Sequence, residues 1–186
     1  EYVSDPKGTS CLSNIKNSAS HLSQLVASLL DYHQLENGLM QLNPVNFSPE
    51  QLVKLSVEGL RLQAEKKGLA ISCEFQNADK DNIWGKIFRG DDFRIRQVLD
   101  NLVSNAIKYT DQGSVHIMAS IRQARNEYNI IIDEHTYELT LQVKDTGKGM
   151  TSEEKQKVFQ AFTRLKGAQG IESTGLGLCI SSELVA

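Results

Sequence analysis

This chain of 186 residues has little excess of either sign of charge, and it has no long apolar run. The formal net charge is only -3 with both signs interspersed, so no basic surface for nucleic acid is expected. No apolar run approaches the roughly 18 residues that cross a bilayer, and the first residues lack a signal pattern, which predicts a soluble region. Whether the full-length protein is anchored to a membrane is left open.

Cysteine is scarce too, and Cys11, Cys73 and Cys179 lie far apart in the sequence. They have no CxxC spacing and no paired histidines, so neither a zinc site nor a disulfide framework is indicated. This use of cysteine favours a reducing, cytoplasmic setting.

An apolar pattern typical of a coiled-coil or helical-hairpin seam runs through residues 11–42 and predicts one long helix. Further leucines widen the stripe, which favours packing in a bundle of several helices. Gly38 and Pro44 are stop signals, and the stretch after them reads as a linker. We therefore expect a first domain at 1–45. The seam positions, spaced alternately three and four residues apart, are Leu12, Ile15, Ala19, Leu22, Val26, Leu29 and His33.

The expected second domain, 46–186, mixes helices and strands without strict strand-helix-strand alternation. It opens with an amphipathic helix that has Ser48 as its expected N-cap, Pro49 at its first position and Gly68 after its end. Two later segments alternate apolar and polar residues and read as antiparallel neighbours. The pattern predicts an α+β fold, a two-layer α/β sandwich with helices on one face of a mixed sheet. The expected elements are strands at 69–75, 114–123 and 137–144, a strand end at 86–92 and a helix at 94–108.

A line of polar residues shares the helix at 94–108 with an apolar stripe but lies on another face. Asn101 and Asn105 are four residues apart and Lys108 follows at helical spacing, although asparagine is a poor helix former. Such a line is often only a solvated helix face. It also suits a ligand, because asparagine oxygens bind Mg²⁺ that shares nucleotide phosphates, and a lysine neutralises phosphate charge. Both interpretations stay open from this helix alone.

Two glycine clusters follow, "DTGKGM" and "STGLGL". In the first, Asp145 ends a strand, and Gly147 and Gly149 allow a ligand to approach closely, with an ordinary turn as the alternative. A buried carboxylate there would accept a hydrogen bond from an exocyclic amine such as that of adenine. In the second, Gly175 and Gly177 open a helix whose N–H groups suit phosphate, unless the segment is only a flexible loop. Neither cluster has the spacing of a P-loop or a dinucleotide fold.

In chain order, four motifs closely resemble the N, G1, F and G2 boxes of sensor histidine kinases: "NAIKYT", "DTGKGM", "VFQAFTR" and "TGLGL". The resemblance covers residues 46–186 as the ATP-binding catalytic domain and implies the histidine-kinase-type ATPase fold. Residues 11–42 resemble the second helix of the dimerisation and phosphoacceptor hairpin. The implied activity is transfer of the γ-phosphoryl group of ATP to a histidine, in two-component signalling. The implied partners are a second copy bound through the 11–42 helix, a phosphoacceptor helix, and the receiver domain of a response regulator.

The resemblance also implies roles for single residues. Asn105 would bind Mg²⁺ with Asn101 near the same metal and the phosphates, and Lys108 would meet phosphate oxygens, which makes these three the implied catalytic residues. Asp145 would accept a hydrogen bond from the adenine amine, and Tyr109 would lie against the ring. The remaining implied contacts are Gly147 and Gly149 around the base, and Thr174, Gly175, Leu176 and Gly177 along the phosphates.

The F-box resemblance makes Phe159 and Phe162 anchors of an ATP lid at 163–174, although plain core positions are the alternative. Thr151 and Glu154 form a capping-box pattern that would start the helix of this box.

The sequence departs from the family in two places. None of its four histidines precedes an acidic residue and a Thr-Pro pair, so we expect all four to be structural or surface residues, and this chain alone to be inactive as a kinase. The chain stops soon after the G2 box, where we expect the second domain to be truncated, and Ser173 stands where a third glycine is common.

Two other functions remain as alternatives. One is an ATP-hydrolysing relative of the gyrase, mismatch-repair or chaperone type, which would carry glutamate at the position of Asn101. The other is a degenerate module that dimerises and relays signals without catalysis.

Overall fold

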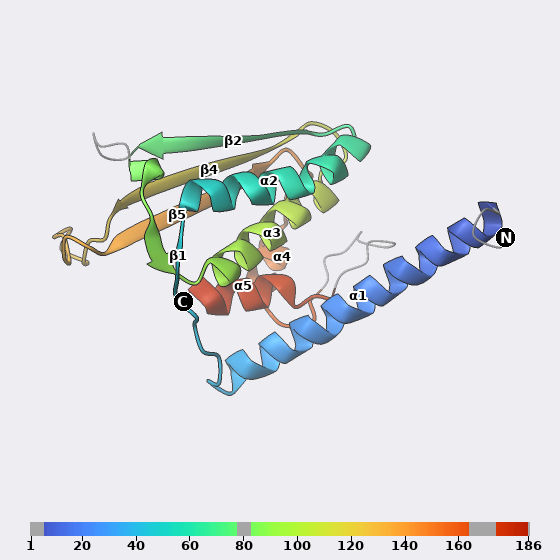
Figure 1. Ribbon diagram of the computed structural model, residues 1–186, viewed down its shortest axis with the longest axis horizontal. Coiled ribbons are helices and arrows are strands. Elements are labelled where there is room, and N and C mark those ends of the chain that lie inside the picture. The colour runs from blue at the N-terminus through green and yellow to red at the C-terminus, as the bar shows by residue number, and fades with distance from the viewer. Residues whose placement is uncertain (1–5, 78–82, 164–173, 186) are drawn as a thin grey trace. The chain divides into compact units, whose positions relative to one another are not determined.

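A three-stranded sheet with two helices on one face is the centre of residues 42–156, one of two compact units of the chain (Figure 1). The computed structural model describes residues 6–77, 83–163 and 174–185. The strands are β2 (Ala70–Asn77), β4 (Ser114–Gln123) and β5 (Tyr137–Asp145), and the helices are α2 (Pro49–Lys66) and α3 (Asp92–Tyr109).

The sheet is mixed, with β4 between its two neighbours. β5 runs antiparallel to β4, which confirms the pairing expected from the alternating residues, and the register sets Val115 opposite Asp145. β2 runs parallel to β4, with Ala70 opposite Ser114, a pairing that the sequence did not predict. The predicted α+β fold with helices on one face of a mixed sheet is therefore confirmed.

The core lies between α2, α3 and the sheet. Leu99, Val103 and Ile107 of α3 are fully buried at helical spacing, and alternate residues of β4 from Val115 to Ile121 are buried in the same way. Because this apolar face of α3 is fixed in the core, the polar line of the same helix is turned away from it.

Two short elements were not expected. β1 (Val45–Phe47) lies in the stretch that reads as a linker, and it pairs antiparallel with β3 (Phe88–Gly90). A single turn of 3-10 helix, η2 (Ile83–Gly85), carries the buried Trp84. The linker interpretation of residues 45–47 is therefore wrong.

The second compact unit joins residues 1–41 with 157–186. Its long helix α1 (Pro6–Glu36) confirms the predicted helix, but the predicted bounds of 11–42 are wrong. Gly38 ends the helix as expected, with φ of 62° and an N–H that donates to the Leu35 carbonyl at 3.0 Å. α5 (Gly177–Val185) packs against α1. The side chains of Leu12, Ile15, Leu22, Val26, Leu29 and Leu30 on α1 are exposed.

None of the described helices is long and apolar enough to cross a membrane.

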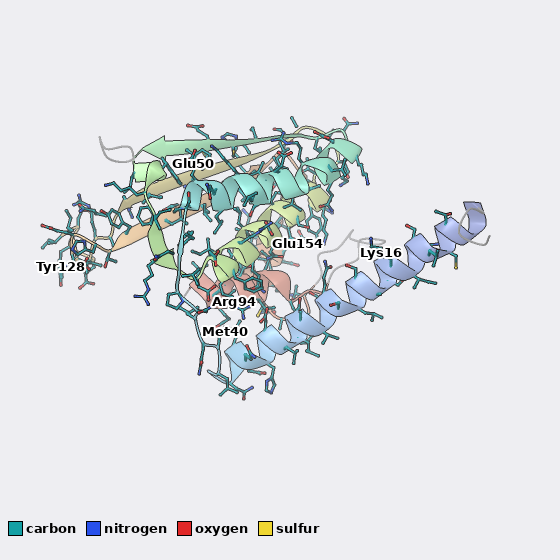
Figure 2. All side chains as sticks on the ribbon, in the orientation of Figure 1. Lys16, Met40, Glu50, Arg94, Tyr128 and Glu154 are labelled. Atoms are coloured by element: carbon teal, nitrogen blue, oxygen red, sulfur yellow. The ribbon has the colours of Figure 1, made fainter. Side chains whose placement is uncertain are left out.

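The N-terminus of α2 has the predicted cap, and its loss should lower stability. Ser48 Oγ accepts a hydrogen bond from the Gln51 N–H at 3.3 Å, and Glu50 stands in the first turn (Figure 2). We expect Ser48→Ala to lower the free energy of unfolding by about 1 kcal/mol, because the N–H loses its acceptor. Urea unfolding measures this, with Ser48→Asp as the control that keeps an acceptor. Equal midpoints for Ser48→Ala and the parent would contradict it.

Candidate functional site

The two asparagines of the polar line are in contact on α3. Asn105 Nδ2 donates to Asn101 Oδ1 at 3.4 Å, and both residues are half-buried. This contact uses the nitrogen of Asn105, and the amide oxygen of the same group is a ligand type that Mg²⁺ accepts. The described residues contain no group of three His, Cys, Asp or Glu side chains that could hold a metal. The oxygen of Asn105, with Asn101 beside it, is the candidate cation ligand on this helix.

The end of α3 lies directly against the turn that follows β5. A Cβ atom on Gly147 would be 2.5 Å from the Tyr109 carbonyl oxygen and 2.8 Å from Asp145 Oδ1. The Gly147 N–H donates to the same Asp145 oxygen at 2.8 Å. Asp145 is exposed, so the expectation of a buried carboxylate is wrong. Only glycine therefore fits between the helix and the carboxylate without a shift of backbone, and the turn and the helix end form one structure.

Thr146 fastens this turn to the loop that leaves α3. Its Oγ1 accepts from the Ser114 N–H at 3.0 Å and donates to the Gln112 carbonyl at 3.2 Å. Gly113 has φ of 114°, and a Cβ there would clash with Thr146 Oγ1. Thr146 was missed in the sequence because a threonine inside a glycine motif carries no pattern of its own. The only available signal was its place beside Gly147 at a strand end.

Gly149 has a different requirement from Gly147. Its φ is 69°, and a Cβ there would meet no described atom within 4 Å. A side chain at this position is disfavoured because φ is positive, and it would not clash with a described neighbour.

The G2-box glycine packs against the F box within the unit that contains α1. A Cβ on Gly175 would be 2.9 Å from the Phe162 Cα and 3.0 Å from the Thr163 carbonyl oxygen. The Phe162 ring meets Tyr32 of α1 edge to face, with centroids 5.9 Å apart. Phe159 and Phe162 are 55% and 62% exposed, so the alternative of plain core positions is wrong. Residues 164–173 of the expected lid lie outside the described residues.

A side chain just before α5 binds the backbone at the start of this helix. Thr174 Oγ1 accepts from the Leu176 N–H at 3.0 Å, and Leu176 is buried. Gly177 is the first residue of the helix. Burial raises the pKa of the Cys179 thiol, so this cysteine stays protonated near neutral pH.

The expected capping box is confirmed at α4 (Ser152–Lys157). The Thr151 N–H donates to Glu154 Oε2 at 2.9 Å, and the Glu154 N–H donates to Thr151 Oγ1 at 3.2 Å. The two bonds satisfy N–H groups at the helix start and have no chemical role.

The expected site residues fall into two groups. The first is held together by the contact between Gly147 and Tyr109, within residues 42–156, and the second by the contact between Gly175 and Phe162, in the unit with α1. The first group comprises Asn101, Asn105, Lys108, Tyr109, Asp145, Gly147 and Gly149. The second comprises Phe159, Phe162, Thr174, Gly175, Leu176 and Gly177.

Comparison with known proteins gives a consistent result. The model of the family described as "Histidine kinase-, DNA gyrase B-, and HSP90-like ATPase" matches residues 90–186. Hybrid signal transduction histidine kinase C of Dictyostelium discoideum is 35% identical over 178 residues, which cover 94% of this chain and 13% of that protein. Signal transduction histidine-protein kinase BarA of Escherichia coli K12 is 30% identical over 176 residues, 94% of this chain and 18% of that protein. The chain thus spans less than a fifth of these relatives.

Solved structures share the fold. Full-length ShkA in complex with AMPPNP aligns with a TM-score of 0.71 at 24% identity, over 97% of this chain and 34% of that one. The histidine kinase AdeS of Acinetobacter baumannii aligns with a TM-score of 0.68 at 22% identity, over 97% of this chain and 73% of that one.

Proposed function

Because this chain belongs to the histidine kinase-, DNA gyrase B- and HSP90-like ATPase family, we propose that it is the catalytic region of a histidine kinase in two-component signalling. It binds Mg-ATP and presents the γ-phosphoryl group to a histidine of a phosphoacceptor helix. The observation that carries the proposal is the close approach of Gly147 to the Tyr109 carbonyl, because it joins the asparagine helix to the Asp145 carboxylate.

The residues of this site suit the two ends of a nucleotide. Asn105 offers an amide oxygen for Mg²⁺, with Asn101 beside it, and Lys108 on the next turn meets phosphate oxygens. Asp145 accepts a hydrogen bond from the adenine amine while it holds the Gly147 N–H, and Tyr109 lies against the ring. Mg²⁺, when bound, neutralises charge on the phosphates.

The other residues that the family motifs indicate complete the nucleotide contacts under this proposal. Gly147 and Gly149 shape the base pocket. Phe159 and Phe162 anchor the lid, and the phosphates lie along Thr174, Gly175, Leu176 and Gly177 at the start of α5, whose N-terminal N–H groups favour negative charge.

Asn101 favours transfer to a histidine over hydrolysis. An ATP-hydrolysing relative needs a carboxylate that accepts a proton from water, and the amide of Asn101 does not accept a proton near neutral pH. Its contact with Asn105 sets this amide beside the proposed metal ligand. The chain therefore positions ATP without activating a water molecule to attack the γ-phosphorus.

The apolar side chains exposed on α1 support a homodimer formed through this helix, the partner contact expected for residues 11–42. The receiver domain of a response regulator is the proposed acceptor of the phosphoryl group after the histidine.

Transfer is tested in the full-length protein with γ-labelled ATP. We expect label that is lost in acid and kept in base, because a phosphorus–nitrogen bond is acid-labile. Rapid release of free phosphate in place of this label would favour the hydrolase alternative.

Base recognition is tested by Asp145→Asn. The Asn oxygen still accepts from the Gly147 N–H, but its NH₂ group faces the adenine amine as a second donor. We expect the binding free energy of Mg-ATP to weaken by about 1 to 3 kcal/mol and the preference for Mg-ATP over Mg-GTP to disappear. The midpoint of urea unfolding should stay unchanged. Calorimetric titration measures both affinities. An unchanged preference for ATP would make Asp145 a turn residue only.

A further inference from the structure

One lysine joins the C-terminal ends of α2 and α3. Lys67 is the C-cap of α2, and Gly68 with φ of 71° turns the chain directly after it. The Lys67 ammonium donates to the carbonyls of Ile107 at 2.8 Å, Lys108 at 2.9 Å and Thr110 at 3.1 Å. All three N–H donors of the group are thus directed at the end of α3.

This arrangement meets two physical requirements at the end of α3. The last carbonyls of a helix have no partner inside the helix, and they carry the negative end of its dipole. A cation at that point supplies both the donors and the opposite charge. The negative end of α2 lies at the same residue, so the ammonium also offsets repulsion between two like helix ends.

Between the Lys108 and Thr110 carbonyls that Lys67 binds lies the carbonyl of Tyr109, which meets the proposed base pocket. The Tyr109 carbonyl oxygen is 2.5 Å from where a Gly147 Cβ would lie, while the carbonyls on both sides of it are bound to Lys67. The end of α3 is therefore held by the ammonium and by the Gly147 turn. Thr110 is fully buried there, and its Oγ1 has no hydrogen-bond partner among the described residues. Its backbone is bonded at both ends, because its N–H donates to the Ala106 carbonyl at 3.1 Å and its carbonyl accepts from Lys67.

We propose that Lys67 is a positioning residue for the nucleotide: it fixes the end of α3, and through it Lys108, Tyr109 and the Gly147 turn. The inference rests on the proposed function, because it concerns the same ATP site. Lys67 itself touches backbone carbonyls and not the nucleotide.

The test compares Lys67→Met with Lys67→Arg, and with Lys66→Met as the matched control from the last turn of α2. Calorimetry on this chain, well below its unfolding temperature, gives the affinities for Mg-ATP and Mg-GTP. We expect Lys67→Met to bind Mg-ATP about three- to tenfold more weakly and to lose part of its preference over Mg-GTP. Lys67→Arg should regain most of both, and Lys66→Met should match the parent.

A second measurement needs no nucleotide. The amide NMR resonance of Gly147 should shift in Lys67→Met and stay in place in Lys66→Met, because the Lys67 ammonium binds the carbonyls on both sides of the one that Gly147 meets. If Lys67→Met does not fold, Lys67→Gln, which keeps two N–H donors without charge, replaces it in both measurements.

The outcomes separate this inference from the proposed function. A Lys67 variant that unfolds at lower urea but keeps the parent affinity, base preference and Gly147 resonance would overturn the positioning role, while loss of binding in Asn105→Ala would still support the ATP site. A parent chain that binds no Mg-ATP would overturn both.

Discussion

Replacing Asn105 with alanine should lower the affinity of the chain for Mg-ATP by about a hundredfold while leaving the fold intact. The change removes the proposed oxygen ligand for Mg²⁺, and losing even an outer partner of a metal site costs about 10- to 100-fold. Asn105 is only half-buried and lies off the apolar face formed by Leu99, Val103 and Ile107. Alanine is also the better helix former, so we expect no loss of stability.

Gln97→Ala is the matched control for Asn105→Ala. Gln97 is another amide residue of α3, about two turns before Asn105, and it accepts a hydrogen bond from Arg94 at 2.8 Å. Calorimetric titration with Mg-ATP, repeated with ATP in the presence of a chelator, measures the effect on both variants. If Asn105→Ala binds as tightly as Gln97→Ala, or if the chelator has no effect on the parent, the polar line is a solvated face and the proposed metal ligand is wrong.

Local patterns predicted the elements of the site well. The three- and four-residue spacing on α3 gave its buried face, and the alternation from Ser114 to Gln123 gave the central strand and its antiparallel neighbour. The caps at Ser48 and Thr151 were predicted because each depends on residues within four positions of one another. Interactions between residues a few positions apart leave a pattern in the sequence.

Contacts between distant segments left no such pattern. The parallel pairing of β2 with β4 joins strands separated by three elements, and β1 pairs with β3 across α2, β2 and η2. Lys67 looks like any lysine at a helix end, yet it binds carbonyls more than 40 residues away. Backbone acceptors carry no side-chain signature, so a role of this kind emerges only from the fold.

The chemical roles of the site residues remain predictions. The order of the four motifs indicated the ATP site, and the fold adds the contact of Gly147 with Tyr109 and the anchoring of the turn by Thr146. The expected division into domains at 1–45 and 46–186 also stays a prediction.

Gly147→Ala should damage the site, although it exchanges only a single hydrogen for a methyl group. The new Cβ would lie 2.5 Å from a backbone carbonyl oxygen of Tyr109 and 2.8 Å from Asp145 Oδ1. The Tyr109 oxygen belongs to the backbone and cannot turn aside as a side chain can, so the turn must move away from α3. We expect stability to fall by about 1 to 3 kcal/mol, as in overpacked interiors. Mg-ATP affinity should fall by more than about tenfold, because the displaced carboxylate would lose the proposed hydrogen bond to the adenine amine.

Gly149→Ala isolates this contact from the effect of backbone conformation. Gly149 has φ of 69° and no described atom within 4 Å of its Cβ position, whereas the φ of Gly147 lies outside the left-handed region. Alanine at Gly149 therefore costs about 1 to 2 kcal/mol of conformational strain without a clash. Urea unfolding and titration with Mg-ATP on both variants give the comparison. Should Gly147→Ala bind Mg-ATP as tightly as the parent, the helix end and the turn are not coupled as we describe, and the base pocket does not depend on their contact.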